Sequence, residues 1–307
     1  MIRSTLRIAG VLLAVLFTAQ SAAAWGREGH RVVARIAARN LNQTARKKLA
    51  IILATNDAGL ESAMAAASIW PDEIDKNKTG TEFWHFIDVP ITGPFSITGL
   101  CSLHNCVLDR IAEMQTRLET NAKGFTLAAP PSPSRPMTSQ ELAFLIHFVG
   151  DVHQPLHAAN DGDRGGVCVQ LLHPIVHSDG SKTTHLHGAW DNDEVIAMAN
   201  VLGSESAIVT TLFQRFKNGA PVSQLMPADW AHESNDLARK DIYQKLNLPN
   251  HTASPGQCAV GIAKIDVGQP YLAGNVADVE TQLMKAGIRL SNVLNQICAG
   301  TGCNAKP

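Results

Sequence analysis

The sequence lacks the excess of positive charge that is typical of proteins that bind the grooves of nucleic acids. Its 307 residues hold 26 lysines and arginines against 27 aspartates and glutamates, a formal net charge of −1 at pH 7. Two of these cations, Arg3 and Arg7, lie close to the start of the chain. A site for a polyanion must therefore obtain its positive charge locally, and bound metal ions would supply it.

Beyond its first residues the sequence also lacks a long apolar run. The run from Ile8 to Phe17 follows two arginines and precedes Ala22-Ala23-Ala24, which is the pattern of a secretory signal peptide over residues 1–24. No later run approaches the roughly 20 apolar residues of a membrane span. We therefore expect no membrane partner, export to the periplasm or outside the cell, and Trp25 as the N-terminus after cleavage.

None of the six cysteines has the C-x-x-C spacing of a zinc knuckle, which argues against cysteine-bound metal. Disulfides are the usual use of cysteine in an exported chain. Cys101 and Cys106 lie five residues apart, as do Cys298 and Cys303, which leaves Cys168 for Cys258. Six cysteines permit 15 pairings, so this pairing is one choice among several.

The sequence has no internal repeat and no low-complexity block, and we expect residues 25–307 to form one domain. Apolar residues recur at helical spacing along most of the chain. Helices are predicted at 29–40, 42–54, 60–70, 108–118, 139–152, 186–200, 205–217, 227–246 and 278–296, the third ending before Pro71. A small hairpin is predicted from 167–172 and 182–184, with a turn at Asp179-Gly180. The predicted fold class is all-α with one β-hairpin.

Two His-x-x-x-Asp pairs stand in segments that read as helix. They are His147 with Asp151 and His187 with Asp191. A spacing of four places both side chains on one helix face, roughly 5–6 Å apart at Cβ. His157 follows the first pair beyond a proline. Imidazole with carboxylate and no thiolate suits zinc in a hydrolytic site.

Further candidate ligands lie nearer the N-terminus. Asp72 follows a helix end, His85 stands among aromatic residues, and His30 lies five residues after Trp25. The new α-amine of Trp25, with a pKa near ~7.7–8, is itself able to bind metal. This set exceeds what one ion takes, and at about three protein ligands per catalytic zinc it predicts two or three ions. Each histidine alone fits a hydrogen-bonded core equally well, but repeated pairing with carboxylates favours metal.

Taken together, these motifs resemble a known family. The chain resembles the zinc-dependent single-strand-specific nucleases, the type I nucleases that include mung bean nuclease and its fungal relatives. The resemblance covers nearly the whole chain after residue 24. It is carried by Trp25-Gly-x-x-Gly-His30, Trp-x-Asp72, Trp-His85-Phe-Ile-Asp88, His147-Phe-x-Gly-Asp151-x-His-Gln-Pro-Leu-His157, Leu-His187-x-x-Trp-Asp191, Trp230-Ala-x-Glu233-Ser234 and Gln282-Leu-x-x-Ala-Gly-x-Arg289.

The resemblance implies the phospholipase C and single-strand nuclease fold and three zinc ions per chain. One zinc would take Asp72, His85, His147 and Asp151. A second would take the Trp25 amine and carbonyl, His30 and the other side of a bridging Asp151, and the third His157, His187 and Asp191. The resemblance further implies that Asp88 orients the attacking water and that Phe86 stacks on a base.

The implied activity is hydrolysis of single-stranded DNA and RNA to 5′-nucleotides, with removal of 3′-phosphates from nucleotides, by a protein expected to be monomeric. Two alternatives remain. One is a zinc-dependent phospholipase C, which has a similar fold and a similar N-terminal tryptophan. The other is a zinc-binding protein that keeps the metal ligands but does not catalyse hydrolysis.

The sequence departs from the family pattern at two positions. Many relatives carry an arginine that clamps the scissile phosphate where this chain has Asp75, which repels phosphate. Lys76 or Lys78 is a candidate substitute, although a lysine is a point charge and not a planar fork. The family's Gly-Gly-Asn reads Gly-Gly-Val167 here, which removes a polar group. The loop between Cys101 and Cys106 is a candidate second wall, with Asn105 able to meet a base edge.

Overall fold

The computed structural model describes residues 25–74, 76–122, 140–219, 221–254 and 256–304. The predicted signal peptide and Asp75 lie outside these ranges. The larger helices are α1 (Gly26–Asn40), α2 (Gln43–Ile52), α3 (Leu60–Glu73), α5 (Val107–Thr120), α6 (Gln140–Asp151), α8 (Glu194–Leu202), α9 (Glu205–Asn218), α10 (Pro227–Leu237) and α11 (Gln269–Ile297). Shorter elements are α4 (Lys76–Thr79), α7 (Leu186–Gly188), the 3₁₀ turns η1 (Glu82–His85), η2 (Ser102–His104) and η3 (Pro155–Ala158), and the π-helical η4 (Ala189–Asp193) and η5 (Ala238–Gln244).

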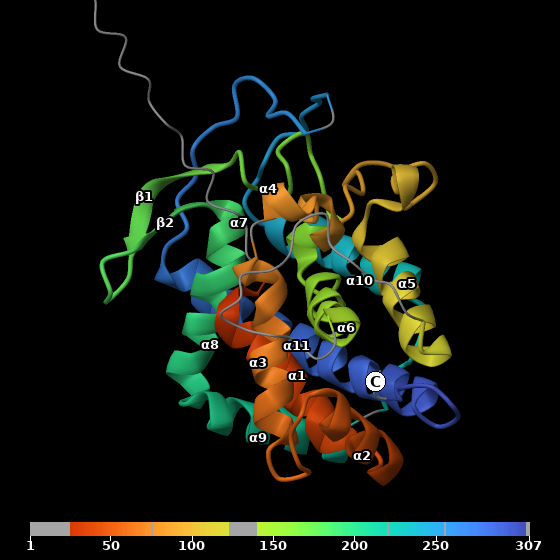
Figure 1. Ribbon diagram of the computed structural model, residues 1–307. Helices are drawn as coiled ribbons and strands as arrows, with labels where there is room; N and C mark the ends of the chain where they lie inside the picture. Colours follow the sequence, from red (N-terminus) through yellow and green to blue (C-terminus); the bar gives the residue numbers. More distant parts are fainter. Residues whose placement is uncertain (1–24, 75, 123–139, 220, 255, 305–307) are drawn as a thin grey trace, which may run out of the picture.

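The described residues confirm the predicted class, a mostly helical fold with one antiparallel hairpin of β1 (Gln170–Val176) and β2 (Lys182–His185). Figure 1 shows the hairpin at one side of the bundle, near α7 and α4, while α2 and α9 lie at the opposite end. No single helix in the described ranges is both long and apolar enough to cross a membrane, and one bent pair, 186–202 with 205–218, passes that test jointly.

Helix α1 lies at the centre, packed against both α3 and α11 (Figure 1). Its apolar face, with Val33, Ile36 and Ala37, is fully buried. The approach of α11 is close because Gly287 faces Ile36: a Cβ at Gly287 would lie 2.6 Å from the Ile36 side chain. Helix α6 packs on α3 and α5 and is buried from Glu141 to Asp151, so its polar ligands project into the interior.

Several predicted boundaries were wrong, and two predicted helices are not regular throughout. Helix α3 continues through Pro71 to Glu73, because a proline near a helix end costs only local hydrogen bonding while Trp70 and Pro71 are buried. Strand β1 begins three residues later than expected, and α11 begins nine residues earlier, with Pro270 in its first turn, where a missing N–H costs little. The predicted helices 186–200 and 227–246 each contain a π-helical stretch.

The disulfides have the predicted pairing: Cys101 with Cys106, Cys168 with Cys258, and Cys298 with Cys303. The described chain has no free cysteine. Two bridges close loops within five residues, whereas the middle bridge joins residues 90 apart. Disulfides of this kind fit an extracellular protein.

Candidate metal centre

The centre is built around the C-terminal end of α6, where His147 and Asp151 share one face. His147 Nε2 lies 3.3 Å from Asp151 Oδ2, as the i, i+4 spacing predicts. The other ring nitrogen of His147, Nδ1, donates to the Ser68 carbonyl of α3 at 2.7 Å. Both ligand side chains are completely buried. Helix α6 therefore fixes two candidate ligands at the middle of the site.

The first cluster joins α6 to the last turn of α3 and to η1. Asp72 Oδ1 lies 3.5 Å from His147 Nε2 and 3.8 Å from His85 Nδ1. His85 Nδ1 is also 3.0 Å from both His147 Nε2 and Asp151 Oδ2. These four side chains are those that the resemblance assigns to one zinc.

The second cluster joins α6 to α1. His30 Nε2 lies 3.3 Å from Asp151 Oδ1, and the rings of His30 and His147 stack with centroids 3.9 Å apart. The two oxygens of Asp151 thus face different neighbours, Oδ1 toward His30 and Oδ2 toward His85. Trp25 is fully buried beside them, and its Nε1 donates to the Gly150 carbonyl at 3.0 Å.

The third cluster brings together His157, His187 and Asp191, from η3, α7 and η4. His157 Nδ1 donates to the His85 carbonyl and His187 Nδ1 to the Gly165 carbonyl, both at 2.7 Å. His187 Nε2 lies 3.3 Å from Asp191 Oδ2. In three triads the ligand atoms, one from each residue, all lie within 4.8 Å of one another: His30–His147–Asp151, Asp72–His85–His147 and His157–His187–Asp191.

The hydrogen bonds of the histidines indicate what these atoms are arranged to hold. In His147, His157 and His187, Nδ1 is the donor to a carbonyl, so Nε2 carries the lone pair when the ring is neutral. His157 Nε2 and His187 Nε2 face each other at 3.1 Å, an unfavourable contact for two lone pairs. Asp151 Oδ1 is buried and accepts no hydrogen bond in the described residues. A cation between these atoms resolves both features, and a backbone carbonyl behind the histidine is the usual support of a metal ligand.

Burial sets the charge states of the ligands. It lowers the pKa of His85, His157 and His187, the last to about 4, because a charged imidazolium is poorly solvated there. Neutral imidazole is the form that binds metal. Burial raises the pKa of Asp191 well above its ordinary value, and of Asp151 likewise, with neighbouring carboxylates adding to the effect. These two carboxylates are therefore stable in their ionised form only with cations beside them.

Asp72 behaves differently from the other two carboxylates. Burial alone would raise its pKa, but His147 and Lys76 outweigh burial and hold that pKa well below its ordinary value. Lys76 Nζ donates to Asp72 Oδ1 at 2.6 Å, and the lysine is buried. Lys76, which we predict as a phosphate-binding residue, is therefore already bonded to a candidate metal ligand. The side chain of Lys78 lies outside what the structure describes.

The other predicted residues lie around this centre. Asp88 follows η1 and is half-buried, and its burial raises the pKa of the carboxyl group. Phe86 is also only half-buried, with its ring centroid 6.0 Å from that of the exposed Phe83. The backbone of Phe86 bonds to Val107, directly after the Cys101–Cys106 loop, so the loop carrying Asn105 lies beside Phe86. No described contact joins the Asn105 side chain to a ligand.

Sequence reasoning assigned no role to several supporting groups. Gln154 Nε2 donates to Asp191 Oδ1 at 2.6 Å, while Gln154 Oε1 accepts from the Leu156 N–H. Its place inside the His-Gln-Pro motif was the one available signal. Gly165 presents its carbonyl to His187, and Arg164 beside it forms an ion pair with Glu82. A cavity of about 740 Å³ opens beside Trp25 and Asp191, between the start of α1 and the hairpin.

Comparison with known proteins identifies the class to which this fold and site belong. The S1/P1 nuclease family matches residues 25–299, and the chain belongs to that family. Relatives include nuclease S1 of Aspergillus oryzae, 28% identical over 95% of this chain and 98% of its own length. Nuclease P1 of Penicillium citrinum is 26% identical, over 89% and 97%, and endonuclease 2 of Arabidopsis thaliana 25% identical, over 92% and 93%. The chain is accordingly a nuclease, a hydrolase of phosphodiester bonds.

Proposed function

We propose that this protein is a zinc-dependent nuclease that cleaves single-stranded DNA and RNA to 5′-nucleotides and also removes 3′-phosphates from nucleotides. The observation that carries the proposal is the presence of three histidine–carboxylate clusters without a thiolate among the ligands. Two of these clusters meet at His147 and Asp151. Nitrogen and oxygen donors of this kind suit zinc. Members of the same family bear the names nuclease and endonuclease.

We assign the ligands of three zinc ions to the three clusters. Asp72, His85, His147 and Asp151 would hold the first, and His157, His187 and Asp191 another. The remaining ion would take His30, Asp151 Oδ1 and the amine and carbonyl of Trp25, after removal of the residues before it. When bound, such ions supply Lewis-acid stabilisation of the phosphoryl oxygens and a readily ionised water.

The surrounding residues position the substrate and the attacking water. Asp88 orients this water by accepting a hydrogen bond, and its raised pKa brings the carboxylate closer to the range of an effective base. Gln154 holds Asp191 Oδ1, and the Ser68 and Gly165 carbonyls hold two imidazoles in the tautomer that leaves Nε2 free for a metal. The chain thereby keeps its ligands oriented without rearrangement.

The preference for single strands rests on Phe86 and Phe83. Phe83 is exposed and Phe86 is half-buried, with their ring centroids 6.0 Å apart. Bases stack on aromatic rings with roughly 1–3 kcal/mol per base. A base inside a duplex has both faces covered and is unavailable for such stacking. We further place the mature protein in an oxidising compartment, the periplasm or the exterior of the cell, in agreement with its three disulfides.

Metal analysis of protein that begins at Trp25, run beside hydrolysis of single- and double-stranded DNA, tests the proposal. We expect about three zinc ions per chain, cleavage of the single strand well above that of the duplex, and 5′-phosphate ends. Protein that retains Ala24 before Trp25 should lose one zinc and most of its activity. Release of phosphocholine from lecithin without cleavage of nucleic acid would overturn the proposal in favour of a phospholipase C.

Asp88→Asn separates the role of Asp88 from metal binding. The variant should lose most of its kcat, by about 100-fold, because general-base assistance contributes 10²–10⁴-fold. Its zinc content should equal that of the wild type. Loss of zinc in this variant would instead make Asp88 a part of the metal centre.

A further inference from the structure

Arg164 lies on the loop between η3 and β1, and this loop is fastened to the third cluster. The residue after it, Gly165, accepts the Nδ1–H of His187 at 2.7 Å. Gly165 is tightly enclosed, since a Cβ there would lie 2.4 Å from the Leu156 carbonyl. Arg164 itself adopts a left-handed backbone conformation with φ 56°, and its N–H lies 3.3 Å from Asn160 Oδ1. Its backbone is therefore held at a fixed place beside His187.

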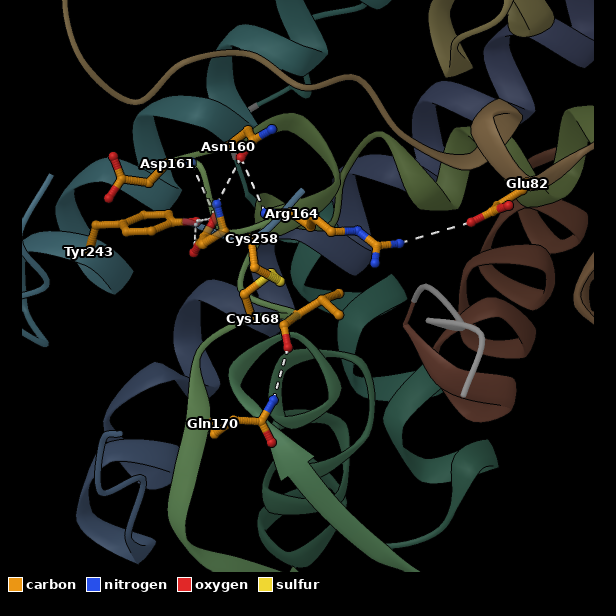
Figure 2. Close-up of a disulfide and its surroundings, with 10 residues drawn as sticks. Glu82, Asn160, Asp161, Arg164, Cys168, Gln170, Tyr243 and Cys258 are labelled. Atoms are coloured by element: carbon orange, nitrogen blue, oxygen red, sulfur yellow. Dashed lines mark hydrogen bonds and ion pairs between the residues drawn. A yellow bond between two sulfur atoms is a disulfide. The ribbon is translucent and has the colours of Figure 1, made fainter. Parts of the chain in front are cut away.

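The other side of the loop is anchored as firmly (Figure 2). The Tyr243 hydroxyl donates to Asp163 Oδ1 and Oδ2, at 3.0 and 2.9 Å, and the Cys168 N–H donates to the Asp163 carbonyl. Cys168 is in turn bridged to Cys258. Such a loop presents one long side chain, that of Arg164, from a rigid base.

The Arg164 side chain extends away from this base toward η1 (Figure 2). Its Nη2 lies 3.9 Å from Glu82 Oε1, and the two side chains are 45% and 46% exposed. An ion pair so long and so exposed contributes roughly 0–1 kcal/mol, so Glu82 is easily exchanged for another anion. Glu82 begins the η1 turn, which carries His85 of the first cluster. The guanidinium of Arg164 therefore lies between this turn and the loop that supports His187 of the third cluster.

Arg164 lies close to both sides of the centre. On one side, burial raises the pKa of Asp88, and the charge of Arg164 opposes that rise. On the other side, the residue after Arg164 accepts the hydrogen bond of His187. Lys76, another cation close to the centre, is buried and bonded to Asp72. Arg164 is thus an exposed cation at the centre with a planar fork of donors for phosphate.

We propose that Arg164 forms a phosphate subsite for the substrate strand, holding by a bidentate contact the phosphodiester next to the one that is cleaved. Glu82 pairs with the Arg164 guanidinium in the free protein, and a phosphate of the bound strand then displaces it. This subsite supplies part of the positive charge that the chain lacks because Asp75 stands where many relatives carry an arginine. It rests on the proposed function, because its ligand is a single strand of nucleic acid.

The test is direct binding by zinc-loaded protein of a fluorescein-labelled phosphorothioate DNA single strand, followed by anisotropy over a series of KCl concentrations. Arg164→Gln should weaken binding about 10-fold and reduce the slope of log K against log[KCl] by about 0.7, the value of one lost phosphate contact on a single strand. Arg164→Lys should keep the slope and recover part of the affinity. Glu82→Gln should strengthen binding by a few-fold.

Arg215→Gln is the matched control, since Arg215 is 51% exposed and pairs with Glu280, with α9 at the far end of the bundle (Figure 1). It should change neither affinity nor slope. In turnover of ordinary single-stranded DNA, Arg164→Gln should raise KM about 10-fold and leave kcat within about two-fold.

Unchanged affinity and slope in Arg164→Gln would overturn the subsite. So would a fall in kcat at constant KM, which a distorted His187 would produce. Wild-type protein that binds the strand but does not cleave it would refute the proposed function and still test Arg164 through its affinity, whereas wild-type protein that neither binds nor cleaves would overturn both.

Discussion

The two His-x-x-x-Asp pairs are identical in spacing yet are held by very different structure. His147 and Asp151 stand on α6, a regular helix buried along nearly its whole length. His187 and Asp191 span the short α7 and the π-helical η4, directly after the hairpin. In both pairs His Nε2 lies 3.3 Å from an Asp oxygen. The same ligand geometry therefore arises from a rigid helix in one case and from an irregular segment in the other.

The difference lies in what supports each pair. The α6 pair depends on packing between helices, and its supporting carbonyl, that of Ser68, comes from α3. The second pair depends on a loop with two left-handed glycines, Gly165 and Gly166, and on the nearby Cys168–Cys258 bridge. Buried polar atoms without a hydrogen-bond partner in the described residues occur in both halves, such as Asp151 Oδ1 and Asp193 Oδ2, so they do not distinguish the two pairs. We conclude that the α6 pair is the stable half of the centre and that the second pair is the half more easily disturbed.

The largest effect should come from Asp151→Asn, because Asp151 serves two clusters and Asp191 only one. We expect Asp151→Asn to reduce zinc content at both clusters and to lower turnover by more than about 100-fold, since even outer supports of a ligand contribute 10–100-fold. Asp191→Asn should remove one zinc alone. Metal analysis and kinetics check both variants. Equal zinc content in the wild type and Asp151→Asn would disprove the bridge.

Gly165→Ala should disturb the second pair while leaving the α6 pair intact. The new Cβ would clash with the Leu156 carbonyl at 2.4 Å in a backbone with φ 58°. We expect loss of one zinc and a fall in activity of about 10–100-fold. Gly180→Ala is the control, because Gly180 has φ 84° and open space around it, and it should keep full zinc content. A Gly165→Ala protein with all its zinc would show that the loop does not orient His187.

A smaller effect is expected at the position where many relatives carry an arginine and this chain has Asp75. Asp75→Arg should raise kcat/KM on single-stranded DNA about ten-fold, since a charge-assisted hydrogen bond contributes roughly 1.5–3 kcal/mol. If Lys76 or Lys78 already contacts the phosphate, the gain will be small and Lys→Ala at that position will be costly. Steady-state kinetics of the three variants decide between these outcomes. If kcat/KM is unchanged in all three variants, none of these side chains contacts the scissile phosphate, and the metal ions and other cations bind it.

Glu194→Gln should leave activity unchanged and alter only the pH dependence of stability. Burial raises the pKa of Glu194 from 4.5 to about 8. The unfolded chain thus releases this proton at lower pH than the folded chain does, and the wild type loses stability as pH rises from about 4.5 to 8. Glutamine does not titrate, so the variant should gain up to a few kcal/mol relative to the wild type at pH about 9 and little at pH about 5. Urea unfolding at both pH values measures this, and an equal difference at both would refute the shift.

Sequence alone could predict the candidate ligands, which the fold brings together, because their chemistry and spacing are local. A histidine and an aspartate four residues apart are recognisable whether α6 or η4 carries them. The groups that orient the ligands were not recognisable. Ser68 and Gly165 act through backbone carbonyls, which every residue possesses, and Arg164 meets Glu82 only because the fold joins two distant turns.

The fold class was equally accessible, while the element boundaries were not. Helix α3 passes Pro71 because burial of Trp70 and its neighbours outweighs a local penalty that sequence rules treat as decisive. Helix α11 starts early because Leu272 and Asn275 are buried, although Gly274 and Pro270 weaken the helical pattern there. In each case tertiary packing, which the sequence does not display, overrides a local preference.

The Cys168–Cys258 bridge has a consequence for where the protein becomes competent. It ties together residues 90 apart, and one of its ends lies three residues from the glycine that steadies His187. Thiols stay reduced in the cytosol, so that ring closes only after the chain meets an oxidising environment. In a chain that is still inside the producing cell, the α6 half of the centre would be formed. The loop that supports the other half would lack its disulfide. On the proposed function, the chain with reduced Cys168 and Cys258 is therefore expected to be the less active form.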